Sequence, residues 1–309
     1  MFDRRSGTKK LGLFDRFRTG LVDLQGCPQL SPALEAWLRD FRRFDFPISR
    51  GSIRLRVSPS GQRGAWLDFA NEDIKALLDS RETLDSLRAT AIVEIGQKRK
   101  RLIERDGALK LGDPVLEPWF ETYVDDLAVP LYCTVGSFTQ PGFRANRALI
   151  TEVMSLVHRA KPKRAAEFGS GIGNFTLPLA SICESVDAYE VDSLALEGLS
   201  RSLAERSLAS RVRIHDGNFQ GAKAEALDMS GLDLLLVDPP RSGLMKFLDP
   251  LEMTQDRPKS LIYVSCFAES FSRDALRLST LGYRLDRISI VDQFPQSRHF
   301  EIVSSFVRY

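Results

Sequence analysis

The chain is short of several features that would place it in other protein classes. Its 309 residues contain only four cysteines, and no two of them have the two-residue spacing of a zinc or redox site. No apolar run reaches the ~18 residues that cross a membrane, and the charged N-terminus lacks the apolar core of a secretory signal. The net charge of +2 permits a nucleic-acid partner without requiring one. We therefore expect a cytoplasmic protein in a reducing environment, without membrane association.

The first part of the chain predicts a small α+β domain behind a basic arm. Residues 1–27 are polar, basic and without clear periodicity, which indicates a loosely held arm. Ser31 and Pro32 are typical of a helix start, since serine caps the first turn and proline fits its first position. Strand-like runs with turn residues between them follow at 52–58, 64–69 and 90–96. We expect the central domain to cover residues 28–136.

The pattern changes to alternating helices and strands over residues 137–309. Helical stretches lie between most of the strands, as in a doubly wound parallel α/β sheet. The last two strands are joined by DQFPQSRH, which leaves no room for a helix, so these two should pair antiparallel. The seven expected strands are RAAEF, VDAYE, RVRIH, LDLLLVD, SLIYVSC, YRLDRISIV and FEIVSSFV.

A glycine-rich loop follows the first of these strands. Gly169, Gly171 and Gly173 let the backbone approach a ligand closely, and the helix that follows adds a partial positive charge at its N-terminus. Dehydrogenases have similar loops, so this signal alone does not choose a cofactor. Glu190 ends the next strand, where an acid binds the ribose of NAD or of S-adenosylmethionine or is simply solvated. Asp216 ends the third strand and can face an adenine.

The fourth strand ends in a carboxylate and two prolines. Asp238 follows the apolar run LLLV, which places its side chain beside the glycine loop. Amine methyltransferases usually carry an aromatic residue after the two prolines, but this chain has Arg241, whose cationic fork suits phosphate or carboxylate. A proline turn without a ligand is the alternative.

Cys266 ends the fifth strand, just before an expected helix near Ala268. A cysteine in an apolar strand is often only a small buried hydrophobe. A helix N-terminus lowers the pKa of a thiol, however, so we expect Cys266 to have a lowered pKa. A pyrimidine is too weak a nucleophile at C5 to accept a methyl group directly, and a thiolate added at C6 activates it.

Two more polar residues have open interpretations. Glu301 lies among apolar residues early in the last strand, where it is either a functional acid or a charge that protects a sheet edge. Gln140 precedes the first helix of the second domain, and its amide can both donate to and accept from a uracil edge.

Together these segments resemble the S-adenosylmethionine-dependent RNA uracil-C5 methyltransferases that act on tRNA and rRNA. The resemblance covers roughly residues 137–309 in family order. It rests on SFTQP (137–141), GIGNFTLPLA (171–180), DPPRSG (238–243), YVSC (263–266), RD (273–274) and DQFPQSRHFE (292–301). It implies a class I methyltransferase, Rossmann-like fold with a seven-stranded, mostly parallel sheet.

The resemblance also implies a role for each site residue. Cys266 would be the nucleophile that attacks uracil C6, and Glu301 the base that removes the C5 proton. Gln140, Phe138, Asp238 and Arg241 would contact the extruded target base and its surroundings. The residues implied around S-adenosylmethionine are Glu167, Gly169, Gly171, Gly173, Asn174, Glu190, Asp216 and Asp238.

The chain departs from the family pattern near the target base. Phe267 follows the nucleophile where asparagine is common, and Gly142 stands where asparagine follows the Gln140 motif. An RNA cytosine-C5 methyltransferase and a non-catalytic RNA-binding relative are therefore the alternatives. DNA cytosine enzymes place their nucleophile at the position of Arg241, which counts against them.

Many family members bind an iron–sulfur cluster through four cysteines, but no cysteine precedes Cys27, so we expect no cluster and no metal. A separate N-terminal RNA-binding barrel is not expected either, and we expect a monomer.

RNA contacts would come from the run QKRKRLIER (97–105) and from the cations of the arm, which are Arg4, Arg5, Lys9 and Lys10. The alternative for the run is a solvated, charged edge strand.

Overall fold

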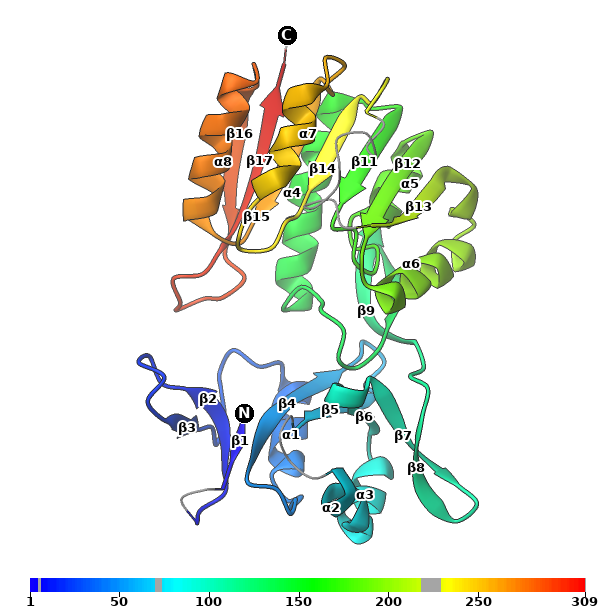
Figure 1. The fold of residues 1–309 in the computed structure, drawn as a ribbon, viewed down its shortest axis with the longest axis vertical. Coiled ribbons are helices and arrows are strands. Elements are labelled where there is room, and N and C mark those ends of the chain that lie inside the picture. The colour runs from blue at the N-terminus through cyan, green and yellow to red at the C-terminus, as the bar shows by residue number, and fades with distance from the viewer. Residues whose placement is uncertain (5–6, 70–73, 218–228, 309) are drawn as a thin grey trace. The chain divides into compact units, whose positions relative to one another are not determined.

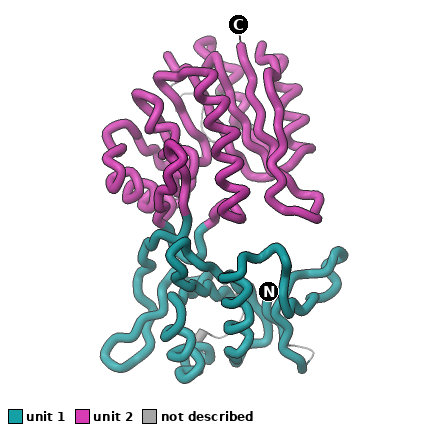
Figure 2. Tube along the Cα trace, turned by 180° about the vertical axis from the view of Figure 1, so that it is seen from behind, with its two compact units in different colours: residues 1–120, 133–137 teal, residues 121–132, 138–309 magenta. Residues whose placement is uncertain are grey.

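The computed structural model describes residues 1–309 except 5–6, 70–73, 218–228 and 309 (Figure 1). Arg5 of the predicted arm lies outside the described residues. The chain forms two compact units, shown in different colours in Figure 2. Unit 1 contains residues 1–120 and 133–137, and unit 2 contains residues 121–132 and 138–309. Residues 121–132 thus pack with the second unit, although they precede the predicted boundary at residue 137.

Unit 1 is built on an eight-stranded sheet with the order β3-β2-β1-β4-β5-β6-β7-β8. Its strands are β1 (Phe2–Asp3), β2 (Lys10–Phe14), β3 (Leu21–Asp23), β4 (Arg50–Val57), β5 (Arg63–Asp68), β6 (Ile92–Ile95), β7 (Lys100–Arg105) and β8 (Ala108–Gly112). Its helices are α1 (Pro32–Phe41), α2 (Ile74–Asp79), α3 (Arg81–Arg88) and the 3-10 turn η1 (Gly96–Lys98). Among the pairs between β4 and β8, only β5 and β6 run parallel, and α2 and α3 lie between them in the chain. The expected α+β character is confirmed.

The start of α1 and its packing follow from the sequence. The Ser31 hydroxyl accepts a hydrogen bond from the Leu34 amide at 3.3 Å, and Pro32 occupies the first turn as predicted. Trp37 and Phe41 are buried on the inner side of the helix. The Trp37 indole also donates to the Gly64 carbonyl at 2.9 Å, which joins α1 to β5.

The prediction of a loose N-terminal arm is wrong. β1 pairs with both β2 and β4, and β2 pairs with β3, so this segment extends the sheet of unit 1. Phe2 and Leu11 are buried in the same core as Trp37. Arg42 on the end of α1 forms a salt bridge with Asp23 at 2.7 Å, which fixes the hairpin further. These strands have two to five residues, too few to show a period-2 pattern.

The basic run 97–105 does not form an edge strand. β7 lies between β6 and β8, and β8 is the last strand of the sheet. Asp106 and Gly107 both have positive φ at the turn between β7 and β8, as their sequence predicted. The interpretation of this run as a charged edge is therefore wrong.

Unit 2 contains a seven-stranded sheet with the order β13-β12-β11-β14-β15-β17-β16 (Figure 1). Its strands are β11 (Arg164–Phe168), β12 (Ser185–Glu190), β13 (Val212–Asp216), β14 (Leu234–Val237), β15 (Ser260–Ser265), β16 (Arg284–Val291) and β17 (Glu301–Val307). Its helices include α4 (Phe143–Ala160), α5 (Thr176–Ile182), α6 (Ser193–Glu205), α7 (Leu248–Met253) and α8 (Ala268–Thr280), with 3-10 turns η2 (Ala209–Arg211) and η4 (Met245–Phe247). β17 is antiparallel to both β15 and β16. The predicted α/β fold with seven mostly parallel strands is confirmed.

Helices cover both faces of this sheet. Leu234 and Leu236 pack with residues of α4 and α5, whereas Leu235 and Val237 pack with residues of η4, α7 and α8. All four side chains of β14 are therefore buried, as expected for a central parallel strand. A further pair of strands, β9 (Glu117–Val124) and β10 (Leu127–Cys133), forms a two-stranded sheet.

Candidate functional site

The predicted site residues gather at one edge of the unit 2 sheet. β11 to β15 are parallel, so their carboxyl ends share an edge. Glu190 and Asp216 are register partners at the ends of β12 and β13. The first loop glycine, Gly169, follows β11 and donates to the Tyr189 carbonyl at 3.0 Å. Asp238 follows β14, and its amide donates to the Phe168 carbonyl at 3.2 Å.

The glycine loop has the shape that its sequence predicted. Gly169, Gly171 and Gly173 all have positive φ, at 81°, 54° and 100°. A Cβ added to Gly171 would meet no atom within 4 Å, so the backbone faces open space there. The Gly171 amide donates to the Glu190 carboxylate at 3.0 Å. Glu190 thus holds the loop, and its oxygens retain acceptor capacity for a further donor.

Two other predicted cofactor residues differ in exposure. Asp216 is exposed. Glu167 is fully buried below the loop, where the Thr176 hydroxyl donates to one carboxylate oxygen at 2.6 Å. The other oxygen, Oε1, has no hydrogen-bond partner among the residues that the structure describes. Burial raises the pKa of Glu167 to about 8, and the negative charges of Asp238 and Glu190 add to the effect.

The strand register brings the predicted nucleophile and base together. Ser265 and Ile302 are the last partners of the antiparallel β15–β17 pair. One further step along the same register sets Cys266 opposite Glu301, and opposite residues of an antiparallel pair point to the same face. Residues two apart on a strand share a face, so Cys266 lies on the face of Val264 and Glu301 on the face of Val303. Val264 and Val303 pack with residues of α4 and α5, so these helices cover that face.

The charges around Cys266 correct one prediction. Burial raises the pKa of the Cys266 thiol, and the carboxylates of Glu301 and Asp238 raise it further. The positive charge of Arg241 acts in the opposite direction. The expected lowering by the start of α8 is therefore wrong, because partial burial and two acids outweigh the helix end.

The two acids beside the thiol are themselves perturbed. Glu301 is 4% exposed, and burial raises its pKa to about 7, although Arg241 lowers it. Burial raises the pKa of Asp238 to about 8, and the charge of Glu301 contributes. The Gln140 amide donates to Asp238 at 3.4 Å, a long hydrogen bond that favours the carboxylate. Carboxyl groups with such pKa values can exchange protons near neutral pH.

The remaining predicted base contacts lie on either side of this centre. Arg241 is exposed on the loop after β14, yet its charge affects both Cys266 and Glu301. Phe138 is 76% exposed, whereas Gln140 two residues later is buried. Phe138 thus offers a free ring face two residues from the buried amide.

Asn174 has a structural partner that sequence reasoning missed. Its amide and that of Asn146 on α4 donate to each other at 2.8 and 3.0 Å. Asn146 has no exposed surface, although it sits among the apolar positions of α4. The sequence does contain a signal for this pair: Asn146 lies three residues before Leu149, at a position of the helix where an apolar residue is expected.

The second missed group is Asp274, in the RD motif on α8. Its Oδ2 accepts from the Leu244 amide at 2.7 Å and from the Tyr263 hydroxyl at 2.9 Å. The neighbouring Arg273 donates to the Ser242 carbonyl at 2.6 Å. A Cβ at Gly243 would clash with Asp274 Oδ2. These contacts fix the loop that carries Arg241.

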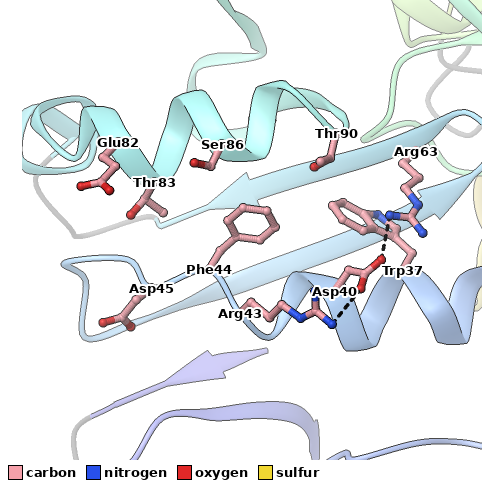
Figure 3. A pocket seen from close by; sticks show the side chains of 10 residues that line it. All are labelled: Trp37, Asp40, Arg43, Phe44, Asp45, Arg63, Glu82, Thr83, Ser86 and Thr90. Carbon is pink, nitrogen blue, oxygen red and sulfur yellow. Dashed lines mark hydrogen bonds and ion pairs between the residues drawn. The ribbon is translucent and has the colours of Figure 1, made fainter.

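Unit 1 contains a separate hollow that holds none of the predicted site residues. Figure 3 shows the side chains that line it. They are Trp37, Asp40, Arg43, Phe44, Asp45, Arg63, Glu82, Thr83, Ser86 and Thr90. Arg63 lies over the Trp37 ring and pairs with Asp40 at 2.9 Å, so both groups already have partners.

Within the described part of the chain, no helix is long and apolar enough to cross a membrane.

Comparisons with known proteins show the family of this chain. The model of the tRNA (uracil-5-)-methyltransferase family matches residues 122–307. An uncharacterized RNA methyltransferase of Bdellovibrio bacteriovorus is 47% identical over 97% of this chain and 78% of its own length. A 23S rRNA (uracil(1939)-C(5))-methyltransferase of Shewanella is 27% identical over 99% of this chain and 67% of its own length.

The fold also has a counterpart among solved structures. The tRNA (uracil-54, C5)-methyltransferase of Pyrococcus abyssi, solved with S-adenosyl-L-homocysteine, has a TM-score of 0.68 at 20% identity. The similarity covers 95% of this chain and 72% of that one. The match to the family model over more than half of the chain and the 47% identical relative together show that this chain belongs to the tRNA (uracil-5-)-methyltransferase family.

Proposed function

We propose that the protein methylates C5 of a uridine in tRNA or rRNA, with S-adenosylmethionine as the methyl donor and Cys266 as a covalent catalyst. The observation that carries this proposal is the β15–β17 register, which sets Cys266 opposite Glu301 at the sheet edge. The glycine loop and Asp238 lie at the same edge. Family membership supports RNA and uracil C5 as the target.

The residues around the glycine loop fit the proposed cofactor. The open space over Gly171 allows close approach to the backbone, and Oε1 of Glu167 is a buried polar atom that has no partner among the described residues and suits a polar group of a ligand. Glu190, with acceptor capacity to spare, would hold the ribose hydroxyls, and Asp216 would face the adenine. When bound, the cofactor supplies an electrophilic methyl group to C5.

Cys266 starts the reaction. Its thiol first loses its proton to solvent water, a step that the charge of Arg241 favours and the charges of Glu301 and Asp238 oppose. The thiolate then forms a bond to C6 of the uracil, and the electrons of the C5–C6 double bond move toward C4 and its oxygen. C5 thereby becomes nucleophilic enough to accept the methyl group.

Glu301 completes the reaction. After methylation C5 carries both a methyl group and a proton, and the Glu301 carboxylate removes the proton. The electrons of that C–H bond re-form the C5–C6 double bond while the S–C6 bond breaks, so the Cys266 thiolate is released. A pKa of about 7 suits this step, because such a group is a usable base near neutral pH.

The target base would be held by groups on both sides of the acids. The Gln140 amide and Asp238 lie within hydrogen-bond reach of each other and would orient the polar edge of the base. The exposed ring of Phe138 would stack on a neighbouring base, and Arg241 would contact a phosphate.

Trapping with 5-fluorouridine-substituted RNA tests the proposal. Fluorine at C5 cannot leave as a proton does, so the wild-type protein should form a covalent, methylated RNA adduct that survives denaturing electrophoresis. Cys266→Ala should form none, whereas Cys27→Ala, which changes another partly exposed cysteine, should behave as wild type. Glu301→Gln should form an adduct with ordinary uridine RNA as well, because elimination fails.

Nucleoside mass spectrometry of total RNA from cells with and without the gene would identify the target. Disappearance of 5-methyluridine from one tRNA or rRNA position supports the proposal. Disappearance of 5-methylcytidine would select the cytosine alternative, and RNA binding with every modification still present would select a non-catalytic role.

A further inference from the structure

The hairpin of β2 and β3 presents an aromatic side chain between two arginines. Phe17 is 78% exposed, more than any other large apolar side chain among the described residues. Arg16 and Arg18 flank it and are exposed as well. The Arg16 guanidinium lies 5.9 Å from the centre of the Phe17 ring. Phe14 and Leu13 on β2 and Val22 on β3 add exposed apolar surface.

The turn that carries this triplet is held in a defined shape. The Asp15 carboxylate accepts from the Thr19 amide at 2.9 Å and from the Thr19 hydroxyl at 2.7 Å. The Arg18 amide donates to the Asp15 carbonyl, and the Asp15 amide donates to the Gly20 carbonyl, both at 3.0 Å. The hairpin therefore displays Arg16, Phe17 and Arg18 with little ordering left to be done on binding.

The hairpin is positively charged toward solvent. Asp15 is engaged by Thr19, and Asp23 is paired with Arg42 at 2.7 Å. The two acids of the hairpin thus already have partners inside unit 1, whereas Arg16 and Arg18 extend from the turn. A single exposed apolar side chain is ordinary, but four of them on one hairpin, Leu13, Phe14, Phe17 and Val22, are typical of a binding surface.

We propose that the Arg16–Phe17–Arg18 tip binds unpaired nucleotides of the RNA substrate, with a base stacked on Phe17 and phosphates against the two guanidinium groups. RNA fits this tip because a strand alternates planar bases with phosphates, as the tip alternates a ring with cations. The inference rests on the proposed function, since it takes RNA as the substrate. It adds a binding surface in unit 1 that the catalytic residues do not include.

Binding to a fluorescein-labelled 20-nucleotide oligouridylate tests the inference directly. Phe17→Ala should weaken binding by about 5- to 150-fold, the usual range for removing one stacking residue. Arg16→Gln with Arg18→Gln should lower the slope of log Kd against log salt by about 1.4, which is ~0.7 for each phosphate that is no longer neutralised. The matched controls are Leu276→Ala on α8, 71% exposed, and Arg287→Gln, exposed on β16; both should leave binding unchanged.

Several results would overturn the inference. Wild-type protein that does not bind the oligonucleotide at low salt, or Phe17→Ala that binds it as tightly as wild type, contradicts it. The inference is also contradicted if the wild-type protein binds an RNA duplex of the same length more tightly than the oligouridylate and Phe17→Ala weakens the binding of both RNAs equally. Phe17-dependent sedimentation with phosphatidylglycerol vesicles, without an effect on RNA, would assign the tip to a membrane surface instead.

Methylation kinetics separate this inference from the proposed function. With total RNA from cells that lack the gene, Phe17→Ala should raise KM while kcat stays near that of wild type. If the wild-type protein is active and Phe17→Ala has the same KM, the role of the hairpin is refuted but the proposed function is not. An inactive wild-type protein that forms no adduct with 5-fluorouridine RNA refutes the proposed function, while the oligonucleotide assay still judges the hairpin.

Discussion

At the scale of single residues, the environment of Cys266 distinguishes it from an ordinary reactive cysteine. Its pKa is raised by burial and by Glu301 and Asp238, which together outweigh the charge of Arg241, so most of the thiol is protonated at neutral pH. Such an arrangement limits side reactions of the free protein, since the thiolate is the reactive form.

This environment predicts opposite effects of two neutral substitutions. Glu301→Gln removes a negative charge and should lower the pKa of the Cys266 thiol, whereas Arg241→Gln removes a positive charge and should raise it. The rate of alkylation by iodoacetamide against pH, followed by peptide mass spectrometry, measures both shifts. The midpoints of the two variants should therefore lie on opposite sides of the wild-type midpoint.

Cys27, which is also partly exposed, serves as the internal reference in the same samples. If both substitutions move the pH midpoint of Cys266 alkylation in the same direction, or if neither moves it, Glu301 and Arg241 do not act on the thiol as described.

The place of Asp238 and of Cys266 at the sheet edge could be predicted from sequence because each follows the end of a strand. Asp238 and Cys266 come directly after apolar strands, and the carboxyl ends of parallel strands meet at one edge. The direction of the thiol pKa could not be predicted. It depends on the burial of the thiol and on the nearness of Glu301 and Asp238, which lie far from Cys266 in the chain, and only the folded structure sets these.

At the scale of elements, the loop between β14 and α7 depends on one buried carboxylate. Asp274 is 2% exposed and receives hydrogen bonds from Leu244 and Tyr263, and Arg273 holds the Ser242 carbonyl. Asp274 therefore acts as a positioning residue for Arg241, which lies three residues before Leu244.

Removal of this carboxylate should affect both folding and chemistry. Asp274→Ala leaves the Leu244 amide and the Tyr263 hydroxyl without an acceptor and should cost about 1–3 kcal/mol of stability. Asp274→Asn keeps an acceptor oxygen and should cost less. If the loop loosens, Asp274→Ala should also raise the alkylation pKa of Cys266, because Arg241 is no longer held nearby.

Tyr263→Phe is the matched control, since it removes one donor to Asp274 and leaves the loop contacts in place. It should cost about 1 kcal/mol and leave the Cys266 pKa unchanged. Equal effects of Tyr263→Phe and Asp274→Ala on that pKa would contradict the positioning role.

The strands of unit 2 were predictable because each carries a clear local signal, whereas the N-terminal strands were not. β17 and β14 are rich in aliphatic and β-branched residues over four to seven positions. β1 and β3 have two and three residues, and their place in the sheet comes from the burial of Phe2 and the Asp23–Arg42 pair. Such tertiary contacts leave no periodic trace in the sequence.

At the scale of the whole molecule, the stability of unit 2 should depend on pH. Glu167, Asp238 and Glu301 of unit 2 have folded-state pKa values raised to about 8, 8 and 7. An acid whose pKa is higher in the folded state binds its proton more tightly there. Its contribution to stability is therefore largest at pH values below its pKa in the unfolded chain. Unit 2 should therefore lose stability as the pH rises from about 4.5 to 8.

Glu167→Gln tests this prediction. Glutamine carries no charge to bury, so the loss of stability between pH 5.5 and 8.5 should shrink by more than about 1 kcal/mol relative to wild type. All three tryptophans, Trp37, Trp66 and Trp119, lie in unit 1, so fluorescence does not report on unit 2. Hydrogen exchange of the β14 peptide, converted to opening free energies, gives the measurement. An unchanged pH slope in Glu167→Gln would contradict the assignment.

The last prediction concerns how the molecule divides its RNA binding between two basic segments of unit 1. The cations of 98–101 are Lys98, Arg99, Lys100 and Arg101, and acidic partners lie beside Lys100 and Arg101. Lys100 pairs with Asp113 at 2.5 Å, and Arg101 lies 3.9 Å from Glu117. Glutamine at all four positions should therefore lower the salt slope of RNA binding by less than the ~2.8 that four neutralised phosphates would give. If the hairpin tip and this run bind the same RNA at once, combining these changes with Arg16→Gln and Arg18→Gln should lower the slope by the sum of the two effects. A combined slope equal to that of either set alone would mean that only one segment contacts the strand, and an unchanged slope in the fourfold variant would remove the run from the RNA surface.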